Sequence, residues 1–203
     1  MKKSMTILYT VKNGLYINLT NRCPCACTFC LRQKGDGVYG SDSLWLEREP
    51  TVEEVLEQID NTDLTKFDEV VFCGYGEPTE RLFDLVKIAE HIKQNYNIPI
   101  RVNTNGLSDL IWQDDTAKYF VGKVDVLSIS LNSTNAEGYL ALTRSKFGIK
   151  SFEALKKFAK SARELRISVV MTIVDTVTTL DEQKKAKQIC DELGVALRIR
   201  PLE

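Results

Sequence analysis

The feature that most constrains this sequence is the regular alternation, from residue 51 onward, of short apolar segments with segments of helical periodicity. Strands that are separated by helices pair in parallel, because the chain must cross back over the sheet before each new strand. The sequence therefore predicts an α/β fold. The predicted strands lie over residues 69–74, 98–103, 124–131, 167–174 and 195–200, and the predicted helices over 80–95, 107–120, 135–142, 151–165 and 180–193.

The N-terminal part predicts a β-hairpin, a long loop and one helix. Asn13-Gly14 is a turn signal between two strand-like runs, of which the second, residues 15–19, begins a series of six parallel strands. Residues 31–50 are polar and Gly-rich and predict a loop in which Tyr39, Leu44 and Trp45 are exposed. Thr51 opens the helix, since Glu54 three residues later completes a capping box.

Length and charge narrow the class of protein. The 203 residues carry 27 basic and 28 acidic side chains, a net charge of −1, and fit one domain over residues 1–203. A near-zero charge argues against binding to nucleic acid. The sequence has no apolar run of membrane-span length, and its first residues lack the apolar core of a secretory signal, so we expect a cytoplasmic protein without membrane contact.

The cysteines are clustered rather than spread along the chain. A disulfide framework would link distant segments, whereas thiols this close together in a cytosolic protein indicate a metal site. The two remaining cysteines lie in apolar surroundings and are expected to be buried. The cluster is Cys23, Cys25, Cys27 and Cys30, and the isolated residues are Cys73 and Cys190.

Polar residues follow the predicted strands at their carboxyl ends. Gly74–Glu77 comes after one strand and Asn105-Gly106 after the next. Ser128, Ser130 and Asn132 alternate along a third, so they are expected on one face. Because the carboxyl ends of parallel strands share one edge, we expect these groups to converge on a single site.

Three of the clustered cysteines, Cys23, Cys27 and Cys30, have the spacing C-x3-C-x2-C, with Phe29 before the last. Three thiolates on a [4Fe–4S] cluster leave one iron open to a ligand. This motif, with the strand-end elements in the same order, resembles the radical S-adenosylmethionine (radical SAM) superfamily from residue 15 to residue 202. The resemblance implies a partial (β/α)6 TIM-like barrel, preceded by the hairpin, as one core domain with its cluster loop over residues 20–50.

The resemblance also implies an enzyme and its cofactors. Such an enzyme cleaves S-adenosylmethionine (SAM) reductively at a [4Fe–4S] cluster, and the 5′-deoxyadenosyl radical abstracts hydrogen from a substrate. The implied metal ligands are Cys23, Cys27 and Cys30. Flavodoxin or ferredoxin is the implied electron donor. The sequence does not identify the substrate.

The resemblance also implies contacts between individual residues and SAM. The backbone at Phe29 and the residue Leu202 would contact adenine, and Arg144 would reach the carboxylate. Ser130 and Asn132 correspond to ribose contacts, with ordinary polar rim residues as the alternative. Arg144 could equally be a solvated surface arginine.

The glycine element departs from the family pattern. Gly74, Tyr75, Gly76 and Glu77 form GYGE where the family has GGE, whose backbone carbonyls accept from the amino group of SAM. A plain strand-to-helix turn is the alternative for this element. Asn105 is a further cofactor candidate, with a simple Asn-Gly turn as the alternative.

The additional thiol Cys25 does not fit the three-cysteine spacing. The run NRCPCACTFC resembles the small TatD-associated radical SAM proteins, which implies a link to a TatD-like metal-dependent hydrolase. Two other functions stay open. One is an activating enzyme that places a radical on a partner protein, and the other is a non-catalytic Fe–S or zinc-binding interaction protein that uses Cys25 as a fourth ligand. A partner or a second copy of the chain could cover an open side of the barrel.

Overall fold

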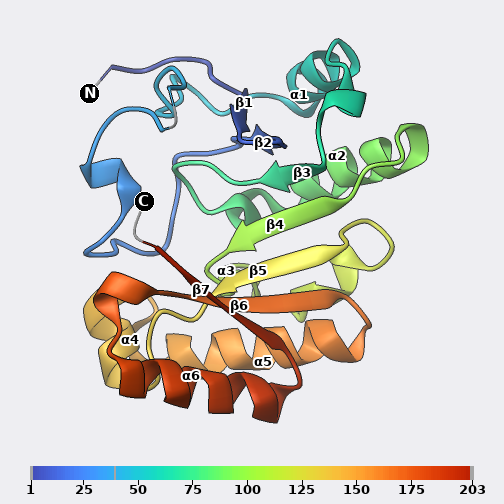
Figure 1. The fold of residues 1–203 in the computed structure, drawn as a ribbon. Coiled ribbons are helices and arrows are strands. Elements are labelled where there is room, and N and C mark those ends of the chain that lie inside the picture. The colour runs from blue at the N-terminus through green and yellow to red at the C-terminus, as the bar shows by residue number, and fades with distance from the viewer. Residues whose placement is uncertain (1, 39, 202–203) are drawn as a thin grey trace. The chain divides into compact units, whose positions relative to one another are not determined.

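The computed structural model describes residues 2–38 and 40–201. The chain forms two compact units (Figure 1). The first comprises Met1–Cys23, Leu31–Asn103 and Gly122–Asp125, and the second comprises Pro24–Cys30, Thr104–Val121 and Val126–Glu203.

The first unit is a small sheet with helices. Its strands follow chain order: β1 pairs with β2 antiparallel, and β2, β3 and β4 pair in parallel. Apolar residues such as Ile17, Val70 and Val102 are fully buried, and so are Val55 and Ile59 of the first helix. The elements are β1 (Leu8–Val11), β2 (Gly14–Ile17), α1 (Val52–Asp60), β3 (Glu69–Phe72), α2 (Leu82–Asn95) and β4 (Ile100–Thr104).

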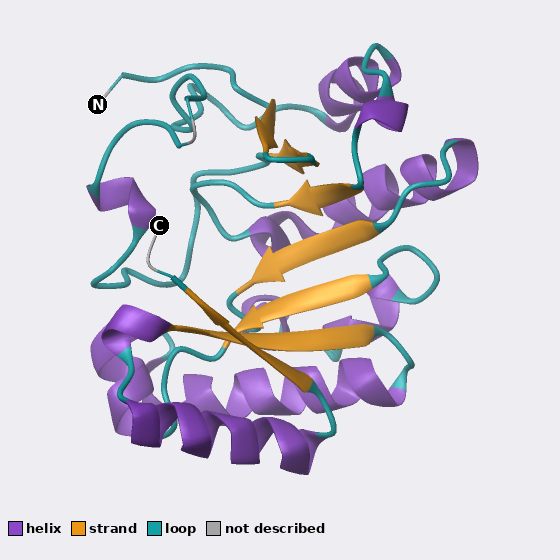
Figure 2. Cartoon of the chain, in the orientation of Figure 1, coloured by secondary structure: helices purple, strands orange, loops and turns teal. Residues whose placement is uncertain are grey.

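The second unit repeats the strand–helix alternation (Figure 2). Its strands β5, β6 and β7 are parallel and lie in chain order. Phe120 and Phe158 meet edge to face in the core, with ring centroids 6.2 Å apart. The elements are α3 (Ser108–Trp112), β5 (Val126–Ser130), α4 (Ala136–Thr143), α5 (Ser151–Glu164), β6 (Ser168–Val174), α6 (Leu180–Leu193) and β7 (Ala196–Arg200).

The expected α/β class, the N-terminal hairpin and the parallel pairing within each unit are confirmed. The turn of the hairpin lies one residue earlier than predicted, because Val11 pairs with Gly14 and Lys12 takes the positive φ of 51°. In the part of the chain that the structure describes, no helix is long and apolar enough to span a bilayer.

The single helix predicted over residues 107–120 is wrong. The segment forms α3 and a separate 3-10 turn, Thr116–Phe120, with Gln113 between them at φ 54°. Asp109 Oδ1 accepts hydrogen bonds from the backbone N and the hydroxyl of Thr116, at 2.8 and 2.7 Å. A short acidic side chain competes in this way with the helical backbone and ends the helix.

The predicted loop is confirmed over the described residues 31–38 and 40–50, and it begins with the 3-10 turn Leu31–Gln33. The expectation that Leu44 is exposed is wrong, since only 1% of its surface is accessible, and Trp45 is half-buried rather than exposed. Tyr39 lies outside the described residues. Leu44 packs with Tyr9 and Tyr75 in a small apolar cluster. The loop is therefore anchored to the sheet of the first unit rather than solvated along its length.

The N-terminus of α1 leads to a prediction of pH dependence. Hydrogen bonds from Arg48 and from the backbone N of Thr51 lower the pKa of Glu54 from 4.5 to about 2. A carboxyl whose pKa falls on folding stabilises the protein above its unfolded value, and this contribution is lost as the pH falls toward the folded value. We expect the melting temperature of Glu54→Gln to vary less between pH 4.5 and 2 than that of the wild type.

Glu53→Gln is the matched control, because Glu53 is an exposed carboxylate in the same turn. It should keep the wild-type dependence on pH. Equal flattening in both variants would contradict the assignment to Glu54.

Candidate functional site

The cysteine segment of the second unit is held by the end of a helix. The backbone N of Ala26 donates to Thr143 O and that of Thr28 donates to Leu142 O, each at 2.9 Å. Lys146 N donates back to Pro24 O at 2.8 Å. The last carbonyls of a helix lack partners within it, so α4 supplies acceptors that fix this irregular segment.

Burial separates the clustered cysteines. All are thiols; Cys25 is buried, with 4% of its surface accessible, whereas Cys23, Cys27 and Cys30 are half-buried. Asn105 Nδ2 lies 3.9 Å from Cys25 Sγ. The three thiols with C-x3-C-x2-C spacing are therefore the more accessible ones, and Cys25 is the enclosed one.

Within residues 2–38 and 40–201, no three His, Cys, Asp or Glu side chains are arranged to hold a metal ion. Cys23 belongs to the first unit, and Cys27 and Cys30 belong to the second. The ligand set therefore stays a prediction. Of the isolated thiols, Cys190 is buried as expected, whereas Cys73, which directly follows β3, is half-buried.

The glycine element of the first unit packs against the segment that leads to the cysteines. A Cβ on Gly74 would lie 2.0 Å from Asn18 Oδ1, and one on Gly76 would lie 2.2 Å from Thr20 O. The backbone N of Glu77 donates to Arg22 O at 2.8 Å. Only glycine permits an approach this close, so residues 74–77 form a narrow backbone cradle.

The side chains of Glu77 and Tyr75 form hydrogen bonds within the protein. Glu77 is buried, and its Oε1 accepts from the backbone N and the hydroxyl of Thr79, at 3.1 and 2.7 Å. The Tyr75 hydroxyl donates to Gly35 O at 2.8 Å. These contacts leave the backbone of residues 74–77, rather than these two side chains, as the part suited to a ligand.

A buried acceptor lies at the end of β5 in the second unit. Asn132 is 3% exposed, and its Oδ1 is buried with no hydrogen-bond partner among the described residues. Its φ of 56° ends the alternation on which the sequence prediction relied, because Leu131 N and Asn132 N both donate to Thr172 O. Ser130, the last residue of β5, is half-buried.

The remaining candidates differ in exposure. Arg144 is exposed and takes the left-handed conformation at the C-terminus of α4, with φ 47°. Phe29 is half-buried. Asn105 Oδ1 accepts from Leu107 N at 2.9 Å, the hydrogen bond of a local turn. Leu202 lies outside the described residues.

The sequence prediction missed a polar cluster on the sheet of the first unit. Arg101 makes a bidentate ion pair with Glu69, at 2.9 and 2.5 Å, and also donates to Asn103 Oδ1. Nearby, burial raises the pKa of the Tyr9 phenol and of the Cys73 thiol, so both stay protonated at neutral pH. Polar residues at alternate positions of the short strand β4, Arg101 and Asn103, were the signal that could have revealed the cluster.

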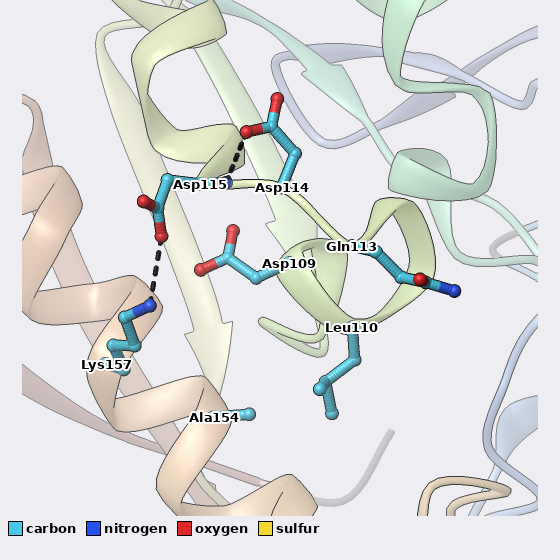
Figure 3. Close-up of a pocket in the computed structure, with 7 residues that line it drawn as sticks. All are labelled: Asp109, Leu110, Gln113, Asp114, Asp115, Ala154 and Lys157. Atoms are coloured by element: carbon cyan, nitrogen blue, oxygen red, sulfur yellow. Dashed lines mark hydrogen bonds and ion pairs between the residues drawn. The ribbon is translucent and has the colours of Figure 1, made fainter.

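A surface pocket of the second unit is lined mainly by acidic and other polar side chains rather than by thiols (Figure 3). Its carboxylates have local partners: Asp109 caps Thr116, and Asp115 forms an ion pair with Lys157 at 3.0 Å. These contacts are structural, and none of the predicted site residues lines the pocket. The lining residues are Asp109, Leu110, Gln113, Asp114, Asp115, Ala154 and Lys157.

The residues present suit an iron–sulfur cluster with a small polar ligand. Accessible thiols are the donor set that such clusters use. The glycines of the cradle in the first unit allow a close approach of backbone, and in the second unit the buried Oδ1 of Asn132 has no hydrogen-bond partner among the described residues. Each of these features fits the group that the sequence motif implies.

Several solved structures have folds similar to that of this chain. Streptococcus suis SuiB bound to precursor peptide SuiA has a TM-score of 0.68 and 18% identity, covering 97% of this chain and 40% of that chain. Native anSMEcpe with bound AdoMet has a TM-score of 0.64 and 19% identity, covering 93% and 50%. A radical SAM methyltransferase from Sphaerobacter thermophilus has a TM-score of 0.61 and 15% identity, covering 96% and 68%.

These similarities confirm the predicted partial TIM-like fold, and the chain spans 40% of the SuiB chain and half of the anSMEcpe chain. A search of curated proteins gives no match. The family model for the radical SAM superfamily matches residues 17–188, well over half of the chain. The chain therefore belongs to the radical SAM superfamily of enzymes, which use a [4Fe–4S] cluster and SAM.

Proposed function

We propose that Cys23, Cys27 and Cys30 hold the [4Fe–4S] cluster and that the chain positions SAM for reductive cleavage. When bound there, such a cluster would supply the electron for reductive cleavage of the S–C5′ bond of SAM, the chemistry from which hydrogen abstraction from a substrate would follow. The observation that carries the proposal is the burial pattern of the cysteines. The three thiols with family spacing are half-buried, while Cys25 is enclosed.

We assign the contacts with SAM residue by residue. The carbonyls of residues 74–77 accept from its amino group, and the close packing of Gly74 and Gly76 supports this role. Asn132 Oδ1, which is buried with no partner among the described residues, accepts from a ribose hydroxyl, and Ser130 lies two residues earlier in the sequence. We also assign the backbone of Phe29 and the residue Leu202 to the adenine of SAM, and Arg144 to its carboxylate. Asn105, which follows a strand, is a further cofactor contact.

Anaerobic reconstitution with iron and sulfide, followed by dithionite and SAM, tests the proposal directly. We expect 5′-deoxyadenosine and methionine to form in equal amounts. A fully loaded cluster that yields no 5′-deoxyadenosine would overturn the enzymatic proposal and favour a non-catalytic Fe–S protein.

Asn132→Gly provides a test of the ribose contact. The residue has a positive φ, so glycine removes the side chain without backbone strain. Loss of one hydrogen bond, about 1 kcal/mol, should weaken SAM binding roughly fivefold. Isothermal titration of the reconstituted protein with SAM measures the change.

Gln113→Gly is the matched control, because Gln113 is exposed and also has a positive φ, 54°. Its affinity for SAM should equal that of the wild type. If both variants bind SAM equally well, the assignment of Asn132 fails.

A peptide or protein substrate is the second candidate, in line with an activating enzyme. The observation that favours it is that two of the similar structures, SuiB and anSMEcpe, hold peptides. Deuterium transfer from deuterated substrate into 5′-deoxyadenosine tests it. Transfer from the protein fraction of a cell extract would support this candidate, and transfer from the small-molecule fraction alone would contradict it.

The wider setting is proposed from the sequence motif. We place the chain in the cytoplasm as a single core domain, with flavodoxin or ferredoxin as its electron donor and a functional link to a TatD-like hydrolase. The run NRCPCACTFC supports the TatD link. Reduction of the cluster by purified flavodoxin or ferredoxin in place of dithionite tests the electron donor, and sedimentation tests whether the chain forms an oligomer.

A further inference from the structure

The loop after the cysteine motif is tied to residues that flank the glycine cradle. Within the described part of residues 31–50, Gly35 O accepts from the Tyr75 hydroxyl at 2.8 Å, and Leu44 O accepts from Asn18 Nδ2 at 2.8 Å. The indole of Trp45 meets the Tyr75 ring edge to face, with centroids 5.3 Å apart. Two separate parts of the loop therefore contact the single side chain of Tyr75.

Tyr75 is held tightly at its own backbone as well. It stands between Gly74 and Gly76, whose close contacts with Asn18 and Thr20 leave little freedom to the peptide units on either side. Its side chain is 5% exposed and packs with Leu44. A shift of the cradle backbone must therefore move the phenol ring, and with it the anchorage of the loop.

We infer that Tyr75 is a positioning residue that couples SAM binding at the cradle to closure of the loop segments 31–38 and 40–50. The inference rests on the proposed function, because it needs the amino group of SAM on the carbonyls of residues 74–77. A ligand that orders this backbone also orders the ring between the two glycines. By linkage, the loop then opens less often when SAM is bound.

The inference gives a reason for the departure from GGE to GYGE. The extra residue, Tyr75, is an aromatic side chain with a hydroxyl. It contacts two separate parts of the loop, at Gly35 and at Trp45. Loop closure after cofactor binding limits the access of water to a reactive intermediate. Tyr75 thus makes closure conditional on the cofactor.

Limited trypsin digestion of the reconstituted protein, with and without SAM and without reductant, tests the coupling. Lys34 is exposed and directly precedes Gly35, so cleavage of the Lys34–Gly35 bond reports the opening of the loop where Tyr75 anchors it. SAM should slow this cleavage in the wild type. Tyr75→Phe, which lacks only the hydroxyl, should be cut about fivefold faster without SAM, and SAM should give it little protection.

Tyr119→Phe is the matched control, since it removes a hydroxyl that donates to Asp114 Oδ2 at 2.8 Å in the second unit. It should keep the wild-type rates with and without SAM. Equilibrium dialysis of SAM on the same samples separates the outcomes. If the wild type binds SAM and Tyr75→Phe is protected to the same degree, only the coupling is overturned; if the wild type does not bind SAM, the proposed function falls with it.

Discussion

Cys27→Ser is expected to abolish both cluster binding and the formation of 5′-deoxyadenosine. Cys27 is one of three half-buried thiols in family spacing, and its segment is fixed on both sides by the hydrogen bonds of Ala26 and Thr28 to α4. A serine hydroxyl is a poor ligand for iron in place of a thiolate, and two thiolates do not retain a cluster that needs three. Iron and sulfide content after reconstitution, visible absorbance and product analysis by mass spectrometry measure the loss.

Cys25→Ser is the control for this prediction. Cys25 has 4% of its surface accessible and lies beside the amide of Asn105, which a hydroxyl can also contact. We expect a full complement of iron and near wild-type product formation. Loss of the cluster in Cys25→Ser, with retention in Cys27→Ser, would mean that the ligand set is a different one.

Local signals were sufficient for most of the fold. The helix predicted over residues 180–193 has these bounds in the structure, because Thr179 and Glu182 form a capping box and Gly194 takes the left-handed conformation after the last turn. Both ends were thus encoded within a few residues. The prediction of a single helix over residues 107–120 is wrong because the carboxylate of Asp109 accepts a hydrogen bond from Thr116, seven residues away. Apolar periodicity does not reveal such a contact.

For the candidate site too, local sequence patterns predicted some features, and contacts between distant segments were visible only in the structure. The spacing of Cys23, Cys27 and Cys30 is a local signal, and it identified the superfamily that the family model confirms. The contact of Asn18 with Gly74, and that of Tyr75 with Gly35, join segments 56 and 40 residues apart. No pattern within either segment specifies such a pair, so these contacts emerged only from the structure.

Gly76→Ala is expected to have the second large effect, on stability and SAM binding together. The added Cβ would lie 2.2 Å from Thr20 O and 2.7 Å from Arg22 O. Both are backbone atoms, which cannot rotate out of the way, so the cost should reach the upper part of the usual range for overpacking, about 3 kcal/mol. Denaturant unfolding of the protein without cofactors measures this loss.

The strain should also reach the cofactors, because Arg22 immediately precedes Cys23 and its carbonyl accepts from Glu77 N at 2.8 Å. We expect SAM binding to weaken at least tenfold, about 1.4 kcal/mol, in whatever fraction still assembles a cluster. Gly35→Ala is the matched control, since its Cβ would have only one neighbour, Gly37 O at 3.8 Å. That variant should stay within about 0.5 kcal/mol of the wild type. Equal stability of the two variants would mean that residues 74–77 do not approach the segment before the cysteines closely enough to form a cradle.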